Sequence, residues 1–212
     1  MDLEKIHRSS KNLDRIEKSA RQISDIIHSV REMEAAESGK SVHGIETLNL
    51  RECIHRSLQQ LEERLSLKQI EIQNCVDEDI FISGYRVGFE TQVLGNLMSN
   101  SIKFSSIGQK LEFHCQRLNT GHVELRIQDY GTGIPPEIMG IIFDASAPTT
   151  RQGTQGEVGT GFGMPIVRSF LQKMNADISI HSKTKEDSPD DHGTTYILKL
   201  EVACSKDHRR AS

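Results

Sequence analysis

The apolar residues near the start of the chain recur with heptad spacing. This pattern, with no proline in residues 1–40, predicts one long helix there with a narrow apolar seam. A helix of this length cannot bury such a seam by itself, so we expect a partner helix from a second copy or from another part of the protein. Packing along the chain's own domain is the alternative. The seam consists of Leu13, Ile16, Ala20, Ile23, Ile27 and Val30.

After a predicted polar connector at 41–49, helical and strand patterns alternate through a predicted domain at 50–203. Apolar residues at helical spacing predict helices that begin near residues 50, 86 and 163, and Asn49 with Glu52 forms a capping pattern for the first. Paired strands between single helices favour an α+β fold, a two-layer α/β sandwich whose mixed, mostly antiparallel sheet carries helices on one face. Residues 204–212 are expected to form a frayed tail. Alternating runs predict strands at 70–72, 80–82, 111–115, 123–129, 177–182 and 194–202.

The composition narrows the possible functions. The net charge of −4 gives no electrostatic reason to expect nucleic acid or an anionic membrane as a partner. No apolar run approaches the roughly 18 residues that a membrane-spanning helix needs. The four cysteines lie far apart without a CxxC pair, which disfavours a zinc ribbon or a redox pair. We therefore expect a globular protein in a reducing compartment, with no nucleic acid partner and no membrane contact by this chain.

The predicted helix over 86–104 has an unusual polar face. Gln92, Asn96, Asn100 and Lys103 lie opposite its apolar stripe. Asparagine is a poor helix former, because its amide competes for backbone hydrogen bonds. Two asparagines one turn apart therefore suggest a function, since an amide oxygen can ligate Mg²⁺ without adding charge. An ordinary polar helix face is the alternative.

Two glycine-rich motifs follow. Asp129 ends a predicted strand and precedes Gly131 and Gly133, so its carboxylate can accept a hydrogen bond from an exocyclic amine, or can simply cap a turn. Gly159-Thr160-Gly161-Phe162-Gly163 stands directly before the helix at 163–174, where backbone N–H groups can converge on a phosphate. We predict that residues 145–160 form a mobile lid; a long disordered loop is the alternative.

The order of these motifs resembles the catalytic, ATP-binding domain of sensor histidine kinases, in the superfamily shared with gyrase, heat-shock chaperones and mismatch-repair ATPases. The resemblance covers residues 50–201 and implies a Bergerat-type ATP-binding fold preceded by the long heptad helix. It rests on QVLGNLMSNSIKFS (92–105), DYGTGI (129–134), IFDASAPTT (142–150), GTQGEVGTGFGMPIV (153–167) and HGTTYILKL (192–200).

The resemblance implies roles for individual residues, with ATP and Mg²⁺ as cofactors. Asn100 is similar to the family's Mg²⁺ ligand, and Asn96 and Lys103 are similar to catalytic positions that face the phosphates. Asp129 resembles the carboxylate that binds the adenine amino group, and the ring of Phe104 would cover the nucleotide. The other implied nucleotide-binding residues are Gly131, Gly133, Ile134, Arg151, Gly159, Thr160, Gly161, Phe162, Gly163 and Thr194, of which Arg151 would reach the γ-phosphate.

Asn96 separates branches of this superfamily. Hydrolytic members carry a glutamate there, which serves as general base for water, and an amide cannot take that proton. The resemblance therefore implies transfer of the γ-phosphoryl group of ATP to a histidine. A nucleotide-binding scaffold and an anti-sigma-type serine kinase are the alternatives; such a serine kinase would usually keep the glutamate.

The helix predicted at 1–40 resembles the second helix of the hairpin through which such kinases dimerise and phosphorylate their histidine. This implies a homodimer in the full protein and a response-regulator receiver domain as partner. None of the nine histidines has the H-E-x-x-x-P context of the acceptor, so we expect these residues to be part of a longer kinase; a protein without an acceptor histidine of its own is the alternative. The expected location is the cytoplasm, for the chain itself or as the cytoplasmic part of a membrane-anchored sensor.

Overall fold

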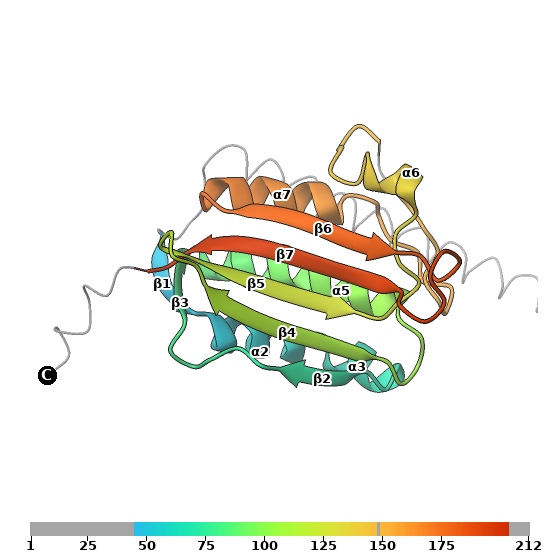
Figure 1. The fold of residues 1–212 in the computed structure, drawn as a ribbon, viewed down its shortest axis with the longest axis horizontal. Helices are drawn as coiled ribbons and strands as arrows, with labels where there is room; N and C mark the ends of the chain where they lie inside the picture. The colour runs from blue at the N-terminus through green and yellow to red at the C-terminus, as the bar shows by residue number, and fades with distance from the viewer. Residues whose placement is uncertain (1–44, 148, 204–212) are drawn as a thin grey trace, which may run out of the picture.

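The computed structural model describes residues 45–147 and 149–203 (Figure 1). The heptad helix predicted at 1–40, the first residues of the connector and the tail at 204–212 lie outside these residues.

Within the described residues, the largest sheet has five strands in the order β2-β4-β5-β7-β6. Strand β2 pairs in parallel with β4, and the other neighbours are antiparallel, which confirms the predicted mixed, mostly antiparallel sheet. Helices α2 and α5 lie together behind the sheet in Figure 1, so the two-layer arrangement is also confirmed. The strands are β2 (Glu71–Asn74), β4 (Lys110–Arg117), β5 (His122–Asp129), β6 (Asp177–Lys183) and β7 (Gly193–Glu201).

The predicted helices are present, with local differences. Asn49 caps the first helix as expected, because its side chain accepts a hydrogen bond from the Glu52 amide at 2.9 Å. The helix predicted at 86–104 is divided into three pieces, of which the middle one is π-helical. The short helix α6 was not predicted. The helices are α2 (Leu50–Gln60), α3 (Glu62–Leu67), α4 (Arg86–Gly88), η1 (Phe89–Leu94), α5 (Gly95–Phe104), α6 (Pro136–Met139) and α7 (Gly163–Lys173).

The prediction of a polar connector at 41–49 is wrong for its last four residues. Residues 46–49 form strand β1 (Glu46–Asn49), which pairs antiparallel with β3 (Phe81–Gly84). Leu48 pairs with Ile82, and both side chains are fully buried. A four-residue strand is too short to show a hydrophobic period, and its position depends on a partner more than 30 residues later.

The hydrophobic core lies between the sheet and its helices. Alternate residues of the central strands point inward, where they meet the apolar stripe of η1 and α5. The apolar stripe faces this core, so the polar face of α5 is turned away from it. Fully buried members include Phe89, Leu94, Leu97, Phe113, Leu125 and Leu198.

Candidate functional site

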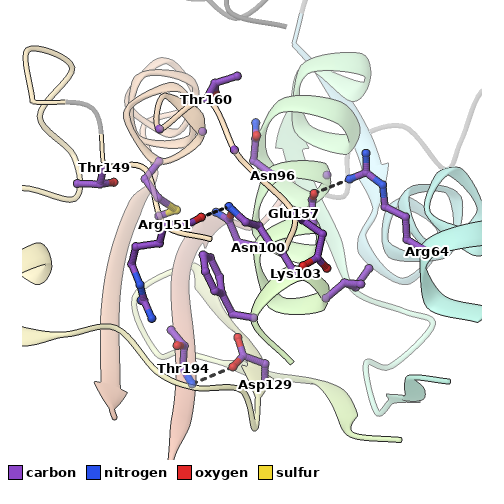
Figure 2. Close-up of a pocket in the computed structure, with 18 of the residues that line it drawn as sticks. Arg64, Asn96, Asn100, Lys103, Asp129, Thr149, Arg151, Glu157, Thr160 and Thr194 are labelled. Carbon is purple, nitrogen blue, oxygen red and sulfur yellow. Dashed lines mark hydrogen bonds between the residues drawn. The ribbon is translucent and has the colours of Figure 1, made fainter. Parts of the chain in front are cut away.

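A cavity of about 750 Å³ opens beside α5, the amino end of α7 and the chain around residues 149–161 (Figure 2). This volume suits a ligand of nucleotide size. Two of the predicted nucleotide-binding residues, Gly131 and Phe162, do not line this cavity. The predicted site residues that line the cavity are Asn96, Asn100, Lys103, Phe104, Asp129, Gly133, Ile134, Arg151, Gly159, Thr160, Gly161, Gly163 and Thr194.

Asp129 lies at one end of the cavity, where β5 ends beside the start of β7. Its Oδ1 accepts hydrogen bonds from the amides of Gly131 at 3.0 Å and Thr194 at 3.1 Å, and Figure 2 shows the bond from Thr194. The hydroxyl of Ser101, a buried residue of α5 that sequence reasoning missed, donates to Oδ2 at 2.9 Å. Burial raises the pKa of Asp129 to about 6, although these hydrogen bonds oppose the shift. The result is a fixed, buried acceptor facing the cavity.

The pKa of Asp129 predicts a pH dependence of stability. Because the folded pKa of about 6 exceeds the usual 3.8, the native state keeps a proton that the unfolded chain has lost in this window. The contribution of Asp129 to the free energy of unfolding therefore falls as the pH rises from about 4 to about 6, by up to about 3 kcal/mol. Asp129→Asn does not titrate, so urea unfolding of both proteins across the window measures the difference. A pH-independent difference would contradict the assignment.

The turn glycines serve the protein's own packing. A Cβ at Gly131 would lie 2.6 Å from the carbonyl oxygen of Phe104. Gly133 has a φ of +74°, and its Cβ would overlap the Lys183 carbonyl. Of the two glycines that the sequence analysis assigned to the ligand site, Gly133 lines the cavity and Gly131 does not. Both glycines keep the turn close to α5 and β6.

Gly133→Ala is expected to lower the free energy of unfolding by more than about 2 kcal/mol. The left-handed backbone costs an alanine about 1 kcal/mol, and the overlap with the Lys183 carbonyl adds to this cost. Gly140→Ala is the matched control, because Gly140 has a φ of −66° and its Cβ would meet nothing within 4 Å. Urea unfolding should place the control within about 0.5 kcal/mol of wild type. Equal effects of the two substitutions would refute the steric explanation.

Helix α5 presents its amides to the cavity. Asn96, Asn100 and Lys103 follow one another at helical spacing, as predicted (Figure 2). The Asn96 Nδ2 donates to the Gln92 carbonyl at 2.7 Å, inside the π-helical segment that precedes α5. A single π-turn inside a helix often accompanies a functional site. The Asn100 side chain makes no hydrogen bond to another described residue, so its oxygen is available to a ligand.

Two cations stack on Phe104. The Lys103 Nζ lies 4.7 Å and the Arg151 guanidinium 4.8 Å from the centroid of the ring. The Lys103 Nζ also donates to the Arg151 carbonyl at 2.7 Å, and burial lowers the pKa of Lys103. Arg151 donates from Nη1 to the Gly133 carbonyl at 2.9 Å. The structure thus places Arg151 at the turn after Asp129, whereas the resemblance suggested the γ-phosphate.

Three further charged residues line the cavity that sequence reasoning missed. Lys68, at the end of α3, is buried and pairs with Glu157, whose Oε1 lies 2.7 Å from its Nζ. Arg64 projects from α3, where its Nη1 donates to the Ser99 hydroxyl at 2.9 Å (Figure 2). All three residues look like surface charges in the sequence, so no single-sequence signal distinguishes them.

Part of the glycine-rich stretch at 153–163 is held in place by backbone hydrogen bonds. The Gly153 amide donates to the Glu157 carbonyl at 2.8 Å, and the Thr154 amide donates to the Lys103 carbonyl at 3.1 Å. Gln152 and Val158 form an isolated bridge. Within the predicted lid at 145–160, residues 153–157 are therefore fastened to α5 in this structure. The site as a whole joins a buried carboxylate at one end to neutral amides and cations along α5, an arrangement suited to a base with an exocyclic amine and an attached phosphate chain.

Comparison with known proteins identifies the family. A family model described as "Histidine kinase-, DNA gyrase B-, and HSP90-like ATPase" matches residues 88–203, more than half of the chain. Histidine protein kinase SaeS of Staphylococcus aureus (strain bovine RF122 / ET3-1) is 27% identical over 199 residues, which are 92% of this chain and 54% of the relative. The chain thus spans about half the length of the curated relatives it matches.

Two solved structures have the same fold. The mycobacterial sensor histidine kinase MprB has a TM-score of 0.62 at 25% identity, over 75% of this chain and 98% of that chain. Histidine kinase AdeS of Acinetobacter baumannii has a TM-score of 0.68 at 18% identity, over 91% of this chain and 84% of that chain.

The chain belongs to the histidine kinase-, DNA gyrase B- and HSP90-like ATPase family. The resemblance to the catalytic domain of a sensor histidine kinase is therefore confirmed, together with the fold class and with ATP as the nucleotide of the family. Among residues 45–147 and 149–203, no helix has both the length and the apolar character that a membrane crossing demands.

Proposed function

We propose that the chain is the ATP-binding catalytic part of a two-component sensor histidine kinase, which transfers the γ-phosphoryl group of Mg·ATP to a histidine. Asp129 accepts a hydrogen bond from the adenine amino group, and Thr194 and Ile134 lie beside the base. The phosphates extend along α5 toward Gly159–Gly163, at the amino end of α7. Affinity in the micromolar range is expected, roughly −6 to −8 kcal/mol.

Mg²⁺ fits the donor set of the cavity. The Asn100 amide oxygen is a hard, neutral ligand, and a nucleotide's phosphates would supply the negative charge. When bound, Mg²⁺ neutralises the charge that develops on the transferred group and its leaving oxygen. Lys103 adds a second positive charge from the same helix face. Its cation–π contact with Phe104 holds the ammonium on that side of the cavity.

One observation favours phosphoryl transfer over ATP hydrolysis: the side chain at position 96 is an amide, which cannot act as a general base. Among the described residues that line the cavity, the acids are Asp129 and Glu157. Asp129 is committed to three hydrogen bonds, and Glu157 is paired with Lys68. Neither lies on the Asn96 face as a free general base, so water is poorly activated there. An incoming imidazole nitrogen brings its own lone pair and needs no such base.

In the transfer, the bond between the γ-phosphorus and the β–γ bridging oxygen breaks, and a phosphorus–nitrogen bond forms with the acceptor imidazole. ADP leaves with the bridging oxygen, and the imidazole proton passes to solvent. The acceptor helix belongs to the dimerisation hairpin of the full protein, which also brings two copies together. A response-regulator receiver domain then accepts the phosphoryl group. Because that transfer takes place in the cytoplasm, we expect this site to lie on the cytoplasmic side of a larger sensor.

Labelled ATP tests this proposal. The chain is incubated with γ-labelled Mg·ATP, alone and with a separate helical hairpin that carries an H-E-x-x-x-P acceptor. The expected result is acid-labile, alkali-stable label on the hairpin, lost when the acceptor histidine is changed to glutamine, and only slow release of phosphate without it. His7, in the helix predicted at 1–40, is the rival acceptor, and label on the chain itself that disappears in His7→Gln would contradict the need for a separate acceptor. Rapid phosphate release with no labelled protein would identify a hydrolase instead.

A further inference from the structure

The ammonium of Lys68 caps the carboxyl end of α5. Its Nζ donates to the carbonyl oxygens of Ile102 and Lys103 at 2.8 Å each and of Ser105 at 3.2 Å. All three carbonyls lie at the helix end, where the helix dipole favours a cation, and the Ile102 carbonyl also accepts from the Ser105 amide at 3.3 Å. Lys68 is only 3% exposed, so the protein has withdrawn this charge from water and must satisfy it internally.

The same ammonium holds the glycine-rich stretch. Its Nζ donates to the Thr154 hydroxyl at 2.8 Å and lies 2.7 Å from the Glu157 Oε1. The Thr154 hydroxyl in turn donates to the Ser105 carbonyl at 2.6 Å. Lys68 therefore joins α5 to residues 153–157 with one ion, which we call the Lys68 latch.

Lys103 lies in the last turn of α5, where the latch joins that helix to residues 153–157. Its carbonyl oxygen accepts hydrogen bonds from the Lys68 Nζ and from the Thr154 amide. A Cβ at Gly153 would lie 2.6 Å from the Lys103 Cγ and 2.8 Å from its carbonyl oxygen, so glycine permits this close approach. The Lys103 Nζ donates to the Arg151 carbonyl at 2.7 Å. Both ends of Lys103 thus depend on where residues 151–157 lie.

We propose that Lys68 is a positioning residue for the nucleotide phosphates, which fixes residues 153–157 to α5 and thereby holds Lys103 in the cavity. This inference rests on the proposed function of the site. Lys68 acts through Glu157 and Thr154, so its effect concerns the phosphate chain. The adenine base would be held at Asp129, whose hydrogen bonds come from the Ser101 hydroxyl and from the amides of Gly131 and Thr194, not from Lys68, Thr154 or Glu157.

A double-mutant cycle tests the latch. Mg·ATP affinity is measured by titration calorimetry, and adenosine affinity by NMR titration, for Lys68→Met, Glu157→Gln and the double variant. Lys68→Met should weaken Mg·ATP about tenfold and adenosine less than twofold. Glu157→Gln should weaken Mg·ATP about threefold, and the double variant should match Lys68→Met, because both changes open one latch. Lys199→Met, on the exposed side of β7, is the matched control and should match wild type.

Three results would overturn the inference. Unchanged Mg·ATP affinity in Lys68→Met would show that the latch does not position phosphates. Tighter Mg·ATP binding in Glu157→Gln, or effects that multiply in the double variant, would show that Lys68 contacts phosphate independently. Parallel losses for ATP and adenosine would show a merely structural role. Wild-type protein that fails to bind Mg·ATP would instead contradict the proposed function itself.

If Lys68→Met does not fold, hydrogen exchange in two milder variants tests the latch instead. In Lys68→Arg and Glu157→Gln, the Thr154 amide, which donates to the Lys103 carbonyl, should exchange at least about tenfold faster than in wild type. Amides of β5 should keep their protection. Unchanged exchange at Thr154 in both variants would refute the latch.

Discussion

Asp129→Asn should reduce Mg·ATP affinity about 100-fold, or about 2.7 kcal/mol, while the protein remains folded. An asparagine Oδ1 can still accept from the amides of Gly131 and Thr194, and its Nδ2 can donate to the Ser101 hydroxyl. The buried hydrogen bonds of the protein are thus retained. The substitution changes the group that faces the adenine ring, because an N–H donor replaces the acceptor that the adenine amino group requires. Discrimination between ATP and GTP should therefore largely disappear.

Titration calorimetry with Mg·ATP and Mg·GTP measures both effects. Asp191→Asn, an exposed change in the loop before β7, is the matched control and should leave both affinities at the wild-type values. Wild-type ATP affinity and selectivity in Asp129→Asn would remove Asp129 from the adenine site. A variant that loses ATP together with its near-UV circular dichroism would be reporting on folding, so that spectrum is recorded alongside.

Asn100→Ala is expected to slow phosphoryl transfer to a supplied acceptor hairpin at least about 100-fold. The reason is the loss of a protein ligand to Mg²⁺, whose charge stabilises the transferred group in the transition state. Nucleotide binding should weaken chiefly when Mg²⁺ is present, because the amide contacts the ion and makes no contact with the base. Affinity for ATP in the presence of a chelator should stay within about twofold of wild type.

The measurement compares transfer rates and ATP affinities with and without Mg²⁺. Asn119→Ala, in the exposed turn between β4 and β5, provides the matched asparagine control. If Asn100→Ala lost equal affinity with and without the metal, Asn100 would have a structural role and the Mg²⁺ assignment would be wrong.

The sequence predicted the parts of the fold that carry a regular period. The central strands alternate between buried and more accessible residues, so the sequence predicts the ends of β5 and β7 to within one residue. Asp129 was found because it ends such a strand directly before a glycine turn. The polar face of α5 was found because asparagines in a helix interior are unfavourable without a function.

The features that were missed depend on contacts between distant parts of the chain. Strand β1 exists because Leu48 meets Ile82 in the core, and a four-residue segment shows no period of its own. Lys68 finds its partners 34 to 89 residues away, from Ile102 to Glu157, so nothing beside it in the sequence distinguishes it from a solvated lysine. The sequence gives no sign of the role of Ser101 either, because its hydroxyl reaches Asp129 only when α5 packs beside the end of β5.

The central claim is that one cavity holds adenine at Asp129 and the metal-bound phosphates at Asn100. A crystal structure of the chain with Mg²⁺ and a non-hydrolysable ATP analogue tests it most directly. The predicted result is an adenine amino group within hydrogen-bonding distance of the Asp129 carboxylate and Mg²⁺ on the Asn100 amide oxygen, with the γ-phosphate on the Asn96 side of Lys103. An analogue bound in the reverse orientation, or outside this cavity, would contradict the account.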